Sequence, residues 1–173
     1  TKSDTGAFAR ALESELDGAE KDLKNDLARQ VFGQKVAISS TYYSGVIGLV
    51  NGDPGTGTTV TVDNGAGVPF GVRVLFVGEK ISFINPATGV ARTEPSGGYE
   101  VASITSATVF EVTSAIDAGV ADNDWIARQG NFGNEINGLR HLISTQPFAG
   151  IDPATVAAWG SLSYGDSSTQ ISE

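Results

Sequence analysis

The sequence predicts an α+β protein that consists of one long helix, a run of short antiparallel strands and a final section of short helices. Three observations lead to this prediction. Apolar residues recur at helical spacing through residues 1–33. Short runs rich in Val, Thr and Ile alternate with glycine-containing turns through residues 34–130, and helical spacing returns in residues 131–173. We therefore expect three parts, of which the middle one forms a small antiparallel barrel or sandwich.

The stretch from Gly6 to Gly33 predicts the long helix. Its apolar residues lie every three or four positions and form one narrow stripe, which we call the apolar stripe: Phe8, Leu12, Leu16, Ala19, Leu23, Leu27 and Val31. Asp4 or Thr5 can cap the start, and Gly33 can end the helix in a left-handed conformation. About 26 helical residues span roughly 39 Å, more than a small domain. We therefore expect the helix to lie like a strut across a sheet or a neighbouring molecule.

Charged residues surround this stripe. Glu20 and Lys24 form an i,i+4 pair of the favourable polarity, as do Asp17 and Lys21. Six acids are distributed around the helix: Glu13, Glu15, Asp17, Glu20, Asp22 and Asp26. They form either a solvated face or an interface with basic residues of a neighbouring subunit.

Five segments of the middle part carry strand patterns. They are residues 35–38, with a weak pattern; 57–65; 72–86, interpreted as two strands broken at Gly78-Glu79; 99–116, interpreted as two strands with a turn near Thr105–Ala107; and 124–130.

The last part carries two helical patterns. The first covers residues 131–145, where Ile136, Leu139, Leu142 and Ile143 lie at helical spacing. The second covers residues 150–162, where Asp152 can be the N-cap and Pro153 the first helical residue.

Composition excludes several classes of function. The 173 residues include 11 Lys and Arg against 20 Asp and Glu, so the net charge is −9. This charge opposes a general affinity for phosphate backbones or anionic membranes. The absence of cysteine excludes disulfides, thiolate nucleophiles and cysteine metal sites. No apolar stretch approaches the roughly 18 residues needed to span a bilayer.

The residues that carry chemistry form no recognisable catalytic, cofactor-binding or metal site. His141 is the only histidine, and no activated nucleophile or orienting acid is evident beside it. Asp122 and Asp124 lack the further ligands of a calcium loop, so a turn is the better interpretation. Residues 65–71, "GAGVPFG", do not match a phosphate-binding loop and indicate a surface loop. Trp125 and Trp159 are expected to be core aromatics.

Several phrases of the sequence resemble, in the same order, phrases of one group of tailed-bacteriophage major capsid proteins. The first runs from a "GAF-x-x-x-L-x-x-E" start to an "L-x-x-D-L-x-R-Q-x-F-G" ending, matched by Gly6, Ala7, Phe8, Leu12, Glu15, Leu23, Asp26, Leu27, Arg29, Gln30, Phe32 and Gly33. A β-rich insertion then ends in "NDWIARQG" at residues 123–130. An "E-I-x-G-L" phrase and a "G-I-D-x-A-T-x-x-x-W" phrase follow, matched by Glu135, Ile136, Gly138, Leu139, Gly150, Ile151, Asp152, Ala154, Thr155 and Trp159.

The resemblance implies the capsid fold shared by tailed phages and herpesviruses. Residues 1–33 would be the spine helix of a peripheral domain, with its apolar stripe packed on the sheet of that domain. Residues 34–130 would be an inserted small β-barrel or sandwich near the outer surface of the capsomer, and residues 131–173 the start of an axial domain with short helices. Family members have an arm before the helix and continue past the tryptophan phrase, so we expect the chain to be part of a longer protein.

The function that the resemblance implies is structural and not catalytic. The chain would be a major capsid protein subunit that assembles into pentamers and hexamers and forms the icosahedral shell around phage DNA. Its expected partner is itself, with scaffolding, portal or decoration proteins as further candidates, and it would enclose DNA without sequence-specific binding. Its expected location is the virion, assembled in the host bacterial cytoplasm, with no membrane contact and no cofactor.

Two alternatives stay open at the level of sequence. The first is a non-catalytic β-barrel binding or decoration module of a virion or cell-surface protein, carried on a helical stalk. In that case residues 131–159 should pack on the barrel as a terminal appendage. The second is a hydrolase, which would need a pocket that gathers Asp, Glu or His141.

Overall fold

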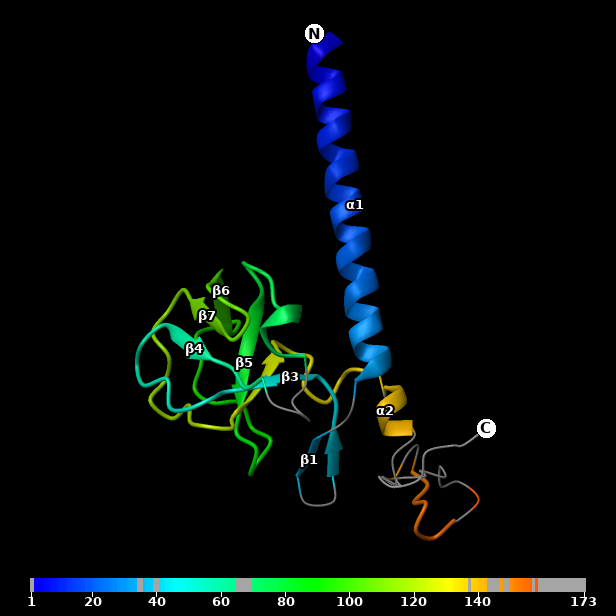
Figure 1. Cartoon of the computed structure of the whole chain (residues 1–173), viewed down its shortest axis with the longest axis vertical. Coiled ribbons are helices and arrows are strands. Elements are labelled where there is room, and N and C mark those ends of the chain that lie inside the picture. Colours follow the sequence, from blue (N-terminus) through cyan, green and yellow to red (C-terminus); the bar gives the residue numbers. More distant parts are fainter. Residues whose placement is uncertain are drawn as a thin grey trace, which may run out of the picture.

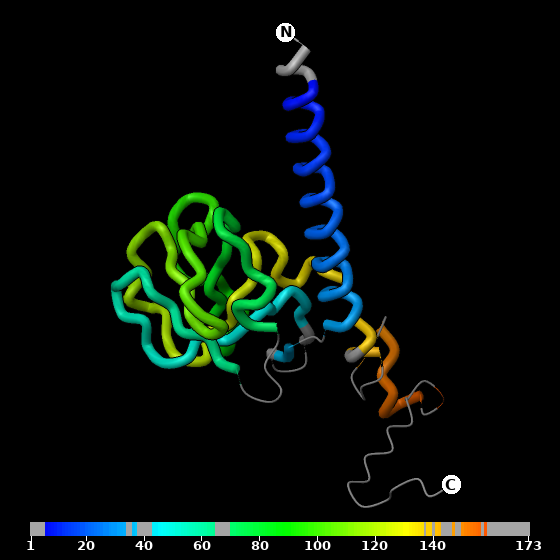
Figure 2. The backbone as a smooth tube through the Cα atoms, turned by 45° about the horizontal axis from the view of Figure 1, so that its top comes forward, coloured from blue at the N-terminus to red at the C-terminus, as the bar shows by residue number. Residues whose placement is uncertain are grey.

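The computed structural model of the chain describes residues 2–33, 36–38, 41–64, 70–136, 138–142, 147, 150–156 and 158. A long helix, α1 (Lys2–Phe32), stands out from a compact β-rich part, and only its C-terminal end lies beside that part (Figures 1 and 2). The remaining elements are β1 (Val36–Ile38), β2 (Thr41–Tyr43), β3 (Val46–Leu49), β4 (Thr59–Thr61), the 3₁₀ helix η1 (Gly71–Val74), β5 (Lys80–Ile84), β6 (Tyr99–Ile104), β7 (Val109–Val112), β8 (Trp125–Arg128) and α2 (Leu139–Leu142). The predicted α+β class is confirmed.

Six strands form one antiparallel sheet in the order β3-β8-β5-β6-β7-β4, and β1 pairs with β2 in a separate hairpin. We call the six-stranded sheet and its described connections the β body. Register shifts between β3 and β8 and between β6 and β7 mark irregularities that increase the local twist. The sheet curls until its two edge strands meet at a bridge between Val50 and Val62. Beside this bridge the Asn51 N–H donates to the Thr61 carbonyl oxygen at 2.9 Å.

The core of the β body lies inside this curled sheet. Its largest fully buried side chains include Phe83, Tyr99 and Phe110. The Tyr99 hydroxyl donates to the Thr93 carbonyl oxygen at 2.9 Å and accepts from the Asp117 N–H at 3.0 Å, so burying this polar group leaves no unsatisfied hydrogen bond. The buried apolar residues of this cluster come from every strand of the sheet, from η1 and from the connections between them: Ile47, Val50, Val60, Val62, Val72, Leu75, Ile81, Phe83, Tyr99, Val101, Phe110, Val112, Ile116, Val120 and Ile126.

Most of the predicted strands are present. The segments at residues 35–38, 57–65, 99–116 and 124–130 contain β1, β4, the hairpin of β6 and β7, and β8. Trp125 is buried as predicted, in a second apolar cluster with Val46, Ile84 and Ala127. Trp159 lies outside the described residues, as does most of the "GAGVPFG" segment. The strands β2 and β3 were not predicted.

One predicted strand is wrong. The first half of residues 72–86 forms η1 and not a strand, and only the second half forms β5. The physical reason is the spacing of the two buried side chains, Val72 and Leu75. Residues three apart lie on the same side of a 3₁₀ helix, so both can reach the core. Gly71 opens this turn with φ of 64°, a conformation that favours glycine.

The long helix ends directly before Gly33, as predicted, but its start and the conformation of Gly33 differ from the prediction. The helix begins at Lys2, so Asp4 and Thr5 lie inside it and do not cap it. At the other end Gly33 does not adopt a positive φ; instead its N–H donates to the Gln30 carbonyl oxygen at 3.2 Å and closes a tight last turn. The second predicted helix, residues 150–162, lies partly outside the described residues. Its predicted cap is present: the Ala154 N–H donates to the Asp152 carboxylate at 2.9 Å, and the Val156 N–H donates to the Asp152 carbonyl oxygen at 3.0 Å.

Among the described residues, no sheet packs along the apolar stripe. Its members Phe8, Leu12, Leu16, Leu23, Leu27 and Val31 are exposed. The sheet of the β body lies to one side of α1 and does not cover the stripe. The helix is therefore attached at one end only.

Candidate functional site

The end of α1 meets the rest of the protein at a network of charged side chains, which we call the ion network. It consists of Asp26 and Arg29 from α1, Glu79 from the turn before β5, Arg128 from the end of β8, and Glu135. These residues are up to 109 positions apart in the sequence. The arrangement fixes the helix to the β body through directional contacts.

Arg29 and Glu135 form the centre of this network. Two guanidinium nitrogens of Arg29 donate to the two carboxylate oxygens of Glu135, at 2.9 and 2.5 Å. The two side chains are only 3% and 5% exposed. Burial would lower the pKa of Arg29, but its hydrogen bonds and charge interactions with Glu135 and Asp26 outweigh burial and raise it. The pair is thus a bidentate contact shielded from solvent.

The backbone around Glu135 is held as firmly as its side chain. The Ser44 hydroxyl donates to the Glu135 carbonyl oxygen at 2.8 Å and accepts from the Glu135 N–H at 3.0 Å. The Asn131 amide donates to a carboxylate oxygen of Glu135 at 3.0 Å. Phe132, which lies between Asn131 and Glu135 in the sequence, stacks on Tyr43, and the two ring centroids are 4.9 Å apart. The turn that carries Glu135 is therefore a fixed support for α1.

Arg128 connects the helix to the sheet. Its guanidinium forms ion pairs with Asp26 of α1 and with the buried Glu79, and donates to the Val74 carbonyl oxygen of η1 at 3.0 Å. It also lies over the Phe76 ring, 5.8 Å from the centroid. One side chain thus ties together α1, η1 and the strand that ends at Arg128.

The two carboxylates that face Arg128 respond differently to their surroundings. Burial raises the pKa of Asp26, but hydrogen bonds from Arg29 and Gln30 and the charges of Arg29 and Arg128 outweigh burial, so its pKa lies below the usual value. For Glu79 burial is the stronger influence, and its pKa is raised despite the Arg128 charge. The network therefore contains one carboxylate that is stabilised in its charged form and one that favours its proton.

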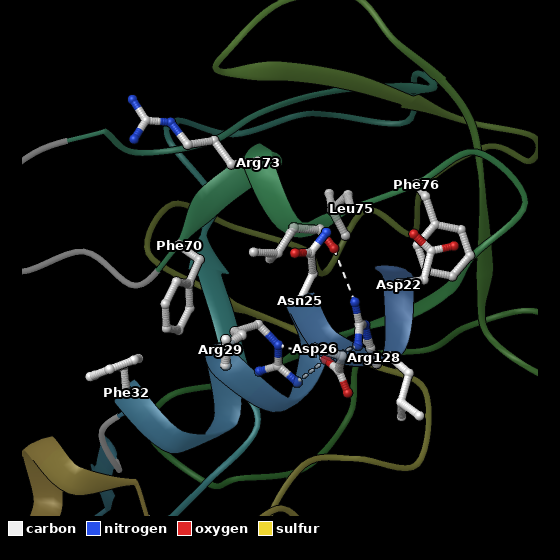
Figure 3. A pocket seen from close by; sticks show the side chains of 13 residues that line it. Asp22, Asn25, Asp26, Arg29, Phe32, Phe70, Arg73, Leu75, Phe76 and Arg128 are labelled. Carbon is white, nitrogen blue, oxygen red and sulfur yellow. Dashed lines mark hydrogen bonds and ion pairs between the residues drawn. The ribbon is translucent and has the colours of Figure 1, made fainter. Parts of the chain in front are cut away.

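A groove of about 690 Å³ runs beside the ion network, between the end of α1 and the segment from Phe70 to Phe76 (Figure 3). Its walls are mainly apolar. Arg73 projects from η1 at one end, and its guanidinium points away from the other lining side chains. The lining residues are Asp22, Leu23, Asn25, Asp26, Ala28, Arg29, Phe32, Phe70, Arg73, Val74, Leu75, Phe76 and Arg128.

Glycine is required where α2 approaches the helix end. A Cβ at Gly138 would lie 2.7 Å from the Gln30 carbonyl oxygen and closer still to that of Gly33. Any side chain at residue 138 would therefore push α2 away from the end of α1. This contact explains the glycine of the "E-I-x-G-L" phrase in physical terms.

The predicted candidates for chemistry have structural roles. Asp124 is buried and accepts two hydrogen bonds from the Arg92 guanidinium, both at 2.8 Å, so it fixes the loop after β5 to β8. Asp122 accepts from the Gly52 N–H at 2.7 Å. His141 is buried in α2, with its Nε2 3.0 Å from the Pro147 carbonyl oxygen. Within the described part of the chain, no cluster of His, Asp or Glu is suited to hold a metal ion.

The structure brings together residues from three of the phrases noted in the sequence. Asp26 and Arg29 belong to the first, Arg128 to "NDWIARQG", and Glu135 to "E-I-x-G-L", and all four lie in the ion network. Sequence reasoning found neither this convergence nor Glu79 and Ser44. One signal was present: Arg128 is a charged residue at the end of an otherwise apolar strand, where a buried partner is expected.

No helix in the described part of the chain is both long enough and apolar enough to cross a membrane. Comparison with known proteins identifies no relative: no family model, no curated protein and no solved structure matches this chain.

Proposed function

We propose that this chain is a subunit of the icosahedral shell of a tailed bacteriophage or a related prophage element, a major capsid protein that associates with copies of itself into pentamers and hexamers. One observation carries the proposal: α1 presents its apolar stripe uncovered along its whole length. Phe8 is 69% exposed, Leu16 61% and Leu23 69%. A helix that leaves this much apolar surface in water is stabilised by covering that surface, as the peripheral-domain sheet of the capsid fold would do.

The way in which the helix is held supports this proposal. Most helices of small proteins obtain their stability from packing an apolar face. Here most of the apolar stripe is exposed, while Arg29, outside the stripe, is fixed by its buried pair with Glu135. A helix that is rigidly oriented and yet uncovered is suited to be a strut between subunits. In this proposal residues 1–33 are the spine helix, 34–130 the β-rich inserted domain and 131–173 the start of an axial domain.

Symmetric repetition makes such an interface effective. In a closed shell each subunit repeats the same contacts, so interfaces of modest size add up to a stable particle. The net charge of −9 is consistent with a shell that does not adhere strongly to the DNA it encloses.

The alternative is a non-catalytic binding or decoration module of a virion or cell-surface protein. The complete core of the β body favours it, because this core needs no other subunit. The section after residue 131 favours the shell instead. Glu135 and α2 contact α1, and residues 150–156 lie beyond α2, on the side away from the β body (Figure 2). A terminal appendage of the module would pack on the β body.

Electron microscopy in negative stain tests the proposal directly. The full-length product is expressed alone and then together with the products of its neighbouring genes. We expect regular pentamers, hexamers or closed shells. A monodisperse monomer under both conditions would contradict the shell proposal and support the binding module, whose ligand would then be sought on the β body.

A further inference from the structure

A second, smaller pocket lies on the outer face of the six-stranded sheet. Its volume is about 260 Å³, and its lining includes Ser82 and Ile84 of β5 together with Glu94. Side chains alternate along a strand, and Ile81 and Phe83 belong to the inner cluster, so Ser82 and Ile84 face the opposite side. The turn after β8 also lines this pocket, which we call the Glu94 pocket.

One oxygen of the Glu94 carboxylate has no partner within the described part of the chain. Its Oε2 is buried from solvent, and no described donor forms a hydrogen bond with it. The neighbouring cations Lys80, Arg92 and Arg128 are paired with other carboxylates. A carboxylate oxygen that is shielded from water without a donor raises the free energy of the folded chain, because it has lost its hydration. A ligand that brings a positive charge and N–H donors would remove this cost.

The other polar groups of the Glu94 pocket can accept hydrogen bonds. Ser82 is only 5% exposed, and its hydroxyl forms no hydrogen bond with any described residue. The Asn134 side-chain nitrogen already donates to the Gly130 carbonyl oxygen at 2.8 Å, which leaves the side-chain oxygen to accept. Gln129, which is exposed, adds a further amide oxygen. The pocket thus offers one negative charge and several acceptors.

The positive charge in the lining does not oppose a cationic ligand. Arg128 lines the pocket, but its guanidinium is paired with both Asp26 and Glu79. A metal ion is disfavoured, because no group of three or more His, Asp or Glu converges anywhere among the described residues. The ligand that fits is therefore an organic cation with N–H donors.

We propose that the Glu94 pocket binds a primary ammonium group at the end of an alkyl chain. Such a group carries one positive charge and three N–H donors, which match the Glu94 carboxylate and the oxygens of Ser82 and Asn134. Glu94 is only partly buried, so a ligand in the pocket reaches its carboxylate. The charge is shared by both carboxylate oxygens, so a cation at one compensates the other as well.

The apolar part of the lining suits the alkyl chain. Ile84 and Phe132, which pack in the second apolar cluster, line the pocket beside the polar groups. A volume of about 260 Å³ accommodates an ammonium group with a few methylenes and not a large ligand. A free alkylamine and the lysine side chain of another protein molecule share this chemistry. The inference goes beyond the shell proposal and does not depend on it, because the pocket is formed within one chain.

Thermal unfolding of the full-length product with two matched ligands tests the site. Butylammonium is charged at pH 7 and donates three N–H bonds, whereas butyltrimethylammonium has the same charge and alkyl chain but no N–H donor. A single charged contact in a small pocket is expected to have a dissociation constant on the order of 1 mM. At about 10 mM, butylammonium should therefore raise the midpoint temperature by roughly 3–5 °C, and butyltrimethylammonium should not.

Three variants assign this effect to the pocket. Glu94→Gln removes the charge with little change in shape and should weaken butylammonium binding by about tenfold or more. Ser82→Ala removes one buried acceptor and should weaken it by a few-fold, on the order of 3-fold. Glu13→Gln is the matched control, because it removes an exposed carboxylate of α1 that lines neither pocket. It should bind butylammonium like the wild type.

The outcomes decide for or against the site whatever the assembly state of the protein. Equal stabilisation by the two ligands would mean that they act only on the overall negative charge, and the inference would be wrong. Equal stabilisation of the wild type and Glu94→Gln by butylammonium would also overturn it. If Glu94→Gln does not fold, Ser82→Ala and the pair of ligands still provide the test.

A third ligand distinguishes the two sources of the ammonium group. In N-acetyl-lysine methylamide the same butylammonium chain is attached to a peptide backbone. If this compound stabilises the wild type as well as butylammonium does, the pocket accepts the lysine of another protein molecule. If only butylammonium stabilises it, the ligand is a free alkylamine. Both results support the ammonium site.

Discussion

The β body and α1 differ in how they use their apolar residues. In the β body the large apolar side chains are buried together, and polar contacts such as those of Tyr99 complete the interior. In α1 the large apolar side chains face solvent, and buried ion pairs attach the helix to the body. Apolar burial supplies stability without direction, whereas a bidentate ion pair fixes an orientation. The β body thus contains its own apolar core, whereas α1 is held by ion pairs and its apolar stripe is exposed.

The first test has the largest expected effect. It truncates one apolar side chain in each of the two regions. Phe83→Ala in the core should lower the free energy of unfolding by about 3–5 kcal/mol, because it leaves a cavity among packed side chains. Leu16→Ala on α1 should change it by less than about 0.5 kcal/mol in the isolated chain, because its side chain already contacts water. Urea unfolding followed by circular dichroism measures both. Equal losses would mean that the stripe is packed within the chain.

The second test breaks the attachment of the helix. Arg29→Met leaves the buried Glu135 carboxylate without its main partner, and we expect a loss of about 3–5 kcal/mol at the junction. Arg29→Met/Glu135→Met should recover much of this loss, because no buried charge then lacks a partner. Hydrogen exchange of the α1 amides, together with urea unfolding, reports the change. If the double variant has as low a free energy of unfolding as Arg29→Met, the pair is needed for more than charge balance.

The third test uses pH. Because the pKa of Asp26 is lowered in the folded chain, the unfolded chain holds more protons near the usual value of 3.8. The contribution of Asp26 to the free energy of unfolding is therefore complete above pH 3.8 and is lost as the pH falls through its lower pKa in the folded chain. The contribution of Glu79 to stability changes with pH in the opposite direction. Its raised pKa means that the folded chain takes up a proton first, so protonation of Glu79 favours folding as the pH falls toward 4.5.

These opposite signs give a clear expectation for two variants. Asp26→Asn should flatten the loss of stability below about pH 4. Glu79→Gln should remove the gain that appears as the pH falls toward 4.5 from above. Thermal unfolding in a series of buffers from pH 3 to pH 7 measures both profiles. Identical profiles for the wild type and Asp26→Asn would indicate that Asp26 has the same pKa folded and unfolded.

The smallest expected effect lies on the solvent side of α1. Lys24→Ala removes the exposed pair with Glu20 and should cost only about 0.2–0.5 kcal/mol, since water and salt screen such pairs. Lys21→Ala is the matched control, because Lys21 makes no ion pair among the described residues. The difference between the two should vanish in about 1 M salt. A cost as large as that of Arg29→Met would contradict the contrast between exposed and buried pairs.

Much of the fold could be predicted because its signals are local. The long helix follows from seven apolar residues at helical spacing with no proline between them. The hairpin of β6 and β7 follows from two runs of strand-forming residues on either side of Thr105–Ala107. The first half of residues 72–86 misled the prediction, because Val72 and Leu75 fit both an extended and a 3₁₀ backbone until the core selects one. The start of α1 was misplaced, because a capping residue is a preference that the surrounding chain can override.

The candidate site could be predicted only in part. The sequence identified the apolar stripe and the acids around it, and it left open whether these acids form a solvated face or contact basic residues of a neighbouring subunit. It did not identify the ion network. Glu79 and Glu135 are ordinary acids in turns, and nothing near them in the chain indicates that one faces Arg128 and the other Arg29.

The sequence by itself determined which segments are helical or extended and which face of α1 is apolar, because these properties depend on residues a few positions apart. Only the tertiary structure decided that the stripe is exposed, that Arg73 lies beside a groove, and that Asp26, Arg29, Arg128 and Glu135 meet. The physical reason is that burial and ion pairing depend on which distant segments the folded chain brings together. Contacts between residues a hundred positions apart leave no local pattern from which they could be inferred.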